Sequence, residues 1–137
     1  MSDAPDGDVY LDEAWVHIHW DRMHKCVHSR WKGFANSAEF RAGLKKGLQA
    51  VRERHATGYV SDGRKIKVIV REDQKWVSEI FMPLMAAAGL KRMAIVTAQA
   101  GLGKLTVEET VQMVDNQGLL MRTFDSLSAA ESWVQQA

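Results

Sequence analysis

The residues best suited to chemistry lie in one short segment, WVHIHWDRMHKCVHSRW, which spans residues 15–31. This segment holds four of the chain's five histidines, its single cysteine and three of its five tryptophans. Imidazole and thiolate groups bind zinc and copper ions, and a cysteine next to a histidine can act as a nucleophile. The segment is therefore a metal site, a catalytic pair, or a strand surface that is rich in histidine.

Apolar and polar side chains alternate on both sides of the polar link 21–24, and this pattern predicts a β-hairpin. If the loop has an even number of residues, the apolar faces of the two strands match, as burial demands. The opposite face then carries the set that we name the candidate interaction face: Trp15, His17, His19, Cys26, His28 and Arg30.

Two registers fit such a loop. A two-residue loop places His17 beside Cys26 and His19 beside His24, whereas a four-residue loop places His19 beside Cys26 and His17 beside His28. Cross-strand Cβ atoms lie about 4.5–5.5 Å apart, so three of these side chains could reach one metal ion. No carboxylate or fourth thiol marks a closed metal site, and Cys26 lies within a strand rather than at a helix N-terminus. We therefore predict a surface, with no metal ligand, catalytic residue or cofactor.

Composition limits the class of protein. The chain has 137 residues, of which 46% are hydrophobic and 26% are charged, and these values fit one globular domain. The acidic, turn-rich residues 1–8 predict a flexible tail, which leaves 9–137 as the domain. A net charge of +1 argues against nucleic-acid binding.

The same composition bears on location. The start of the chain lacks the features of a secretory signal. No apolar run approaches the roughly 20 residues that span a bilayer, so we expect no membrane insertion. A single cysteine cannot form an internal disulfide. Together these features suggest a cytoplasmic protein.

The rest of the chain alternates between helices and strands. Helices are predicted at 34–55, 71–90, 105–118 and 125–137, and strands at 56–65, 91–98 and 119–124. Asn36 with Glu39, and Thr106 with Glu109, match the capping box that begins a helix. Gly43 and Gly47 indicate either close approach of the first helix to a sheet or two tolerated glycines.

The resulting order ββαβαβαβα predicts an α/β fold with a mixed, mostly parallel five-stranded sheet, in which an N-terminal hairpin precedes βα repeats. Strand order cannot be derived from the pattern. If the parallel strands follow one another without reversal, the crossover helices share one face and leave the other face largely bare.

Several stretches resemble the SpoIIAA-like proteins of the STAS superfamily: WKGFANSAEFRAGL, VSDGRK, EDQKWV, MPLMAAAGLKRMAIV, GKLTVEE and FDSLSAAESWV. The resemblance covers roughly residues 10–135. It implies a small non-enzymatic regulatory module that works through protein contact and is often dimeric, with a fold shared with the lipid-binding CRAL-TRIO domains. Some relatives carry a phosphorylated serine in a turn, but here Ser61 precedes Asp62 and Gly63, so that role is not carried over.

Three functions follow from this reading. The first is a STAS-like binding module with an unidentified protein partner, which forms a homodimer through the hairpin face or a sheet edge. The second is a carrier of a small apolar ligand beneath the kinked helix around Pro83. The third is a metal-binding protein that uses the hairpin face. The glycine-rich AGLGKLT does not match a P-loop, and the basic stretch GRKIKVIVR is a solvated loop or a short edge strand.

Overall fold

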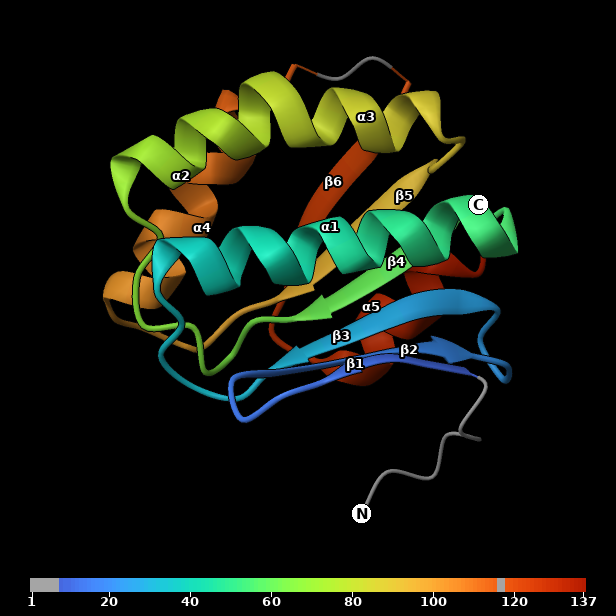
Figure 1. The fold of residues 1–137 in the computed structure, drawn as a ribbon, viewed down its shortest axis with the longest axis horizontal. Coiled ribbons are helices and arrows are strands. Elements are labelled where there is room, and N and C mark those ends of the chain that lie inside the picture. The colour runs from blue at the N-terminus through green and yellow to red at the C-terminus, as the bar shows by residue number, and fades with distance from the viewer. Residues whose placement is uncertain (1–7, 116–117) are drawn as a thin grey trace.

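The computed structural model describes residues 8–115 and 118–137, and its centre is one sheet with six strands in the order β1-β2-β3-β4-β5-β6 (Figure 1). The first three strands pair antiparallel, and the rest continue parallel to the third. Their bounds are β1 Val9–Asp12, β2 Val16–Asp21, β3 Cys26–Trp31, β4 Gly58–Asp62, β5 Arg92–Val96 and β6 Leu120–Phe124. The predicted α/β class is confirmed.

The prediction of five strands is wrong because it omitted β1. This strand has four residues and an irregular register with β2, so no alternating pattern marks it in the sequence. Just before it, the Asp8 carboxylate accepts hydrogen bonds from Arg22 Nε at 2.6 Å and Arg54 Nη2 at 3.1 Å. The other residues of the predicted tail, 1–7, lie outside the described part of the chain.

The helices divide unequally between the two faces of the sheet (Figure 1). The helical face is covered by α1 (Ser37–Arg54), α2 (Arg71–Trp76), the π-helical turn η2 (Val77–Phe81), α3 (Met82–Ala87) and α4 (Leu102–Met113). Right-handed crossovers between neighbouring parallel strands place these helices on one side. The last helix, α5 (Leu127–Val134), packs on the opposite face over β4, β5 and β6. That face, which we call the α5 face, is therefore not bare as expected.

α1 begins and packs as its sequence predicts. Asn36 is its N-cap, and the reciprocal bonds of the capping box with Glu39 are both present. A Cβ atom at Gly43 would meet the Trp31 ring at 2.9 Å, and one at Gly47 would collide with the Tyr59 hydroxyl. Of the two interpretations of these glycines, close approach to the sheet is the correct one.

The helical segment 71–87 changes its winding at its centre. The Met82 N–H donates to the carbonyl of Val77, five residues earlier, which is the bond of a π-helical turn. Pro83 follows directly and has no N–H to donate, so a regular α-helical pattern cannot pass through it. Pro83 thus restarts the helix as α3, and Gly89 lies just past its end with φ of +102°.

The predicted start of the next helix is wrong. α4 begins at Leu102, after Gly101 with φ of +106°, so Thr106 and Glu109 lie inside the helix. Thr106 Oγ1 instead accepts the Ile69 N–H at 2.9 Å, and the Glu109 carboxylate accepts from Gln74 Nε2 at 3.3 Å. The residues that resemble a cap therefore tie α4 to α2 and to the segment before α2.

That segment, residues 63–70, is a loop, so the interpretation of GRKIKVIVR as an edge strand is wrong. The loop lies close against the start of α4, because a Cβ atom at Gly103 would collide with the Ile66 carbonyl oxygen. At its beginning, the Arg64 guanidinium pairs with the Asp62 carboxylate at 2.7 Å.

The helices of residues 8–115 and 118–137 are each too short or too polar to span a lipid bilayer.

Candidate functional site

The hairpin has an even loop, but its register is neither of the two expected. Residues 22–25 form the turn, Asp21 lies opposite Cys26, His19 opposite His28 and His17 opposite Arg30. β2 runs one residue further than either proposed register allowed and β3 begins later, at Cys26, because Asp21 closes the turn itself: its Oδ1 accepts the N–H groups of Met23 and His24. This Asx-type turn is the feature that the sequence reading missed.

Trp15 does not share a surface with the histidines. It precedes β2 and packs on the helical face, where its ring centroid lies 6.4 Å from that of Trp31 and close to Gly43 of α1. The period-two pattern placed Trp15 with His17, but the regular strand begins only at Val16. Of the candidate interaction face, the remaining five residues lie on the α5 face of β2 and β3.

The histidines of this face form a row of rings. His19 lies between His17 and His28, and its ring centroid is 5.2 Å from that of each neighbour. Nδ1 atoms of His19 and His28 are buried with no hydrogen-bond partner. Burial and the neighbouring imidazole of His19 lower the pKa of His28 to about 4, and burial and His17 lower the pKa of His19. His19 and His28 are therefore harder to protonate than a free imidazole, and the side chains of His17 and His28 are buried rather than exposed on a surface.

Cys26 is not placed for nucleophilic chemistry. Its side chain is fully buried beneath α5, among Val60, Ala94 and Val134. Burial raises the pKa of the Cys26 thiol far above its usual range, and the charge of Asp21 adds to the effect. A thiol that is neutral and inaccessible is a packing group.

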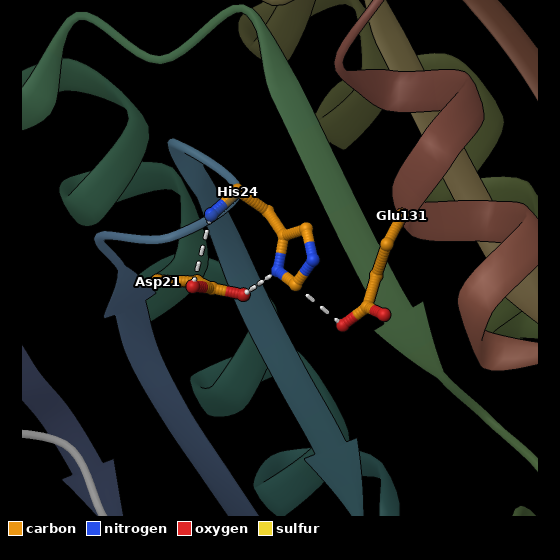
Figure 2. A group of neighbouring side chains, drawn as sticks. All are labelled: Asp21, His24 and Glu131. Atoms are coloured by element: carbon orange, nitrogen blue, oxygen red, sulfur yellow. Dashed lines mark hydrogen bonds and ion pairs between the residues drawn. The ribbon is translucent and has the colours of Figure 1, made fainter.

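A group of side chains that was not predicted as a site gathers at the hairpin turn. Asp21, His24 and Glu131 are, within residues 8–115 and 118–137, the one set of three or more His, Cys, Asp or Glu side chains whose ligand atoms all lie within 4.8 Å of one another. Figure 2 shows that Glu131 reaches this turn from α5. No three of His17, His19, Cys26 and His28 meet that distance.

A separate feature lies beneath the helical face. A cavity of about 60 Å³ is bounded by apolar side chains of α1, η2, α4 and the sheet, together with the Ser61 and Thr110 side chains. A shallower groove adjoins it and shares Trp31, Phe40 and Ile66 as lining residues. Ser61 is buried in β4 at this cavity, so it does not occupy an exposed turn.

Comparisons of the chain with family models, with curated proteins and with solved structures find no match. Function therefore has to be inferred from the side chains and motifs of this chain itself.

Proposed function

We propose that the chain is a non-enzymatic, STAS-like binding module that works through contact with another protein. The quoted motifs and the βα repeats support this proposal. The buried, neutral thiol of Cys26 supports it as well, because the hairpin then offers no nucleophile to accompany its histidines.

The observation that carries the proposal is a group of exposed apolar side chains at one end of the molecule. Phe34, Leu102 and Leu105 are all more than half exposed, with Phe34 at 67%. They flank the loop 63–70, because Phe34 and Lys67 line the same shallow groove and Gly103 lies against Ile66. The starts of α1, α2 and α4 meet at this end (Figure 1). Exposed apolar side chains that gather in this way are typical of protein contact surfaces.

Charge indicates what kind of partner fits this surface. Lys65 and Lys67 are exposed on the same loop, and no described acidic side chain pairs with either. A second copy of the chain would bring the same lysines to the contact, and like charges would disfavour it. The partner is therefore a different protein, with an apolar patch that is bordered by carboxylates.

The test compares two double variants, each of which replaces two exposed apolar side chains with serine. Phe34→Ser with Leu102→Ser removes the proposed contact, and Ile80→Ser with Leu84→Ser removes exposed apolar side chains on η2 and α3. The wild-type chain and the control should retain the same acidic protein from an extract of the source cells. With that protein purified, calorimetry should show at least tenfold weaker binding to the first variant. Equal binding by all three chains, or equal loss in both variants, contradicts the proposal.

The cavity favours a second candidate, a carrier of a small apolar ligand. The volume of about 60 Å³ is well below the roughly 150 Å³ of a cavity that holds benzene. A ligand would therefore have to move α1 or α4 away from the sheet. An apolar fluorescent probe that binds and is displaced by short-chain alcohols would favour this candidate over protein contact.

A further inference from the structure

The turn of the hairpin and the last helix bring three ligand-type side chains to one point. Asp21 ends β2, His24 lies in the turn, and Glu131 lies on α5 (Figure 2). Nδ1 of His24 is 2.7 Å from Oδ2 of Asp21 and 3.6 Å from Oε2 of Glu131. Their side chains are 16–23% exposed, so solvent reaches the point without filling it.

Hydrogen bonding leaves one of the two carboxylates unsatisfied. A neutral imidazole nitrogen carries at most one proton, so Nδ1 of His24 can donate to Asp21 or to Glu131 but not fully to both. Asp21 is the nearer acceptor, and it already accepts two backbone N–H groups of the turn. The Glu131 carboxylate has no hydrogen-bond donor among the described residues.

Electrostatics point in the same direction. Burial raises the pKa of Asp21, but hydrogen bonds from the side chain and backbone of His24 outweigh this effect and hold the pKa below its ordinary value. Burial raises the pKa of Glu131, and the negative charge of Asp21 raises it further against the attraction of His24. Two carboxylates thus converge on one imidazole nitrogen in a partly buried place. A cation at this point would relieve their repulsion.

We propose that Asp21, His24 and Glu131 bind one divalent metal ion, and that Zn²⁺ fits the donor set best. One imidazole nitrogen with two carboxylate oxygens is a ligand combination that zinc accepts, and three protein ligands leave a position for water. The ion binds through Nδ1 when the proton of the neutral ring is on Nε2. Because its ligands come from the hairpin turn and from α5, the ion joins segments that are more than a hundred residues apart in sequence. This site is separate from the protein contact surface proposed above.

The test uses the tag-free full chain, stripped of metal, and titrates it with Zn²⁺ in a calorimeter. We expect one equivalent to bind, with at least tenfold weaker binding to Glu131→Gln and to His24→Gln. The matched control is His55→Asn, which removes an exposed histidine at the end of α1, where the residue has φ of 51° and asparagine is well tolerated. Its affinity for zinc should equal that of the wild type.

Thermal unfolding separates a site from loose association with the other histidines. At one zinc concentration that saturates the wild type, the Tm of the wild type should rise by about 5 °C or more, and that of Glu131→Gln should rise clearly less. Without metal, Glu131→Gln should be at least as stable as the wild type, because it removes a like-charge contact, so a failure to fold will not imitate the result. Equal zinc binding by wild type and Glu131→Gln, or binding without a rise in Tm, overturns the proposal.

Discussion

The imidazole of His28 is 8% exposed and stacks on His19, so folding places it in a setting that disfavours its charged form. Its pKa falls to about 4 in the folded chain, against about 6.5 when unfolded. As pH falls, the unfolded chain therefore takes up this proton first, and stability is lost between about pH 6.5 and pH 4. Above pH 6.5 the contribution is fully present.

This linkage gives a measurable prediction. Between pH 7.5 and pH 5, His28 alone should lower the free energy of unfolding by about 2 kcal/mol. The lowered pKa of His19 acts in the same direction. Urea unfolding at both pH values checks the loss, and His28→Gln should show a clearly smaller difference. A wild-type chain that is equally stable at both pH values would contradict the lowered pKa values of His19 and His28.

Single residues also show which parts of the candidate site could be predicted from the sequence and which could not. The alternation of residues 16–20 and 26–30 correctly placed His17, His19, Cys26, His28 and Arg30 on one face of the sheet. The exact register depended on the Asp21 side chain, which closes the turn, and no alternating pattern records that. Glu131 could not be assigned to the turn at all, because its position depends on α5 crossing to the opposite face.

At the scale of elements, α1 lies against the sheet through its glycines, and a larger side chain there should be costly. Gly47→Ala would drive a Cβ atom into the hydroxyl of Tyr59, whose side chain is buried and cannot move aside. Such overpacking costs typically 1–3 kcal/mol, which exceeds the gain of about 1 kcal/mol in helix propensity. The net effect should be a loss of up to about 2 kcal/mol in the free energy of unfolding, measured by urea titration.

A matched change is available in the loop before α1. Gly33 has no heavy atom within 4 Å of an added Cβ, and its backbone does not require glycine. Gly33→Ala should therefore be neutral or slightly stabilising. If both variants lose the same stability, contact between Gly47 and Tyr59 is not the cause.

Elements were predictable where local chemistry decides them and not where distant contacts do. Asn36 and Glu39 cap α1 through neighbours three residues apart, and the sequence shows this directly. Thr106 and Glu109 have the same spacing, yet their side chains bind the loop and α2, and α4 starts earlier. β1 was missed because pairing with β2, rather than its own four residues, makes it a strand.

At the scale of the whole molecule, β1 is the terminal strand of the sheet among the described residues, and an edge strand can pair with another strand. We predict a homodimer in which two β1 strands meet. Sedimentation at about 100 μM should show the dimer for the wild type and a monomer for Val9→Lys, because a charge on an edge strand opposes such pairing. Val70→Lys, at an exposed valine of the loop end, should remain dimeric. A wild-type chain that sediments only as a monomer contradicts the prediction.

The position of α5 has a consequence for how the chain is made in the cell. A ribosome releases the strands in order, so β4 and β5 can pair before α5 exists. Until Leu127–Val134 emerges, Val60, Ala94 and Val96 lie on an uncovered apolar sheet face. A nascent or prematurely terminated chain that ends before Leu127 therefore exposes an apolar surface, to which chaperones and other copies of the chain can bind. The last helix of the fold thus determines when this apolar face of the new chain becomes covered.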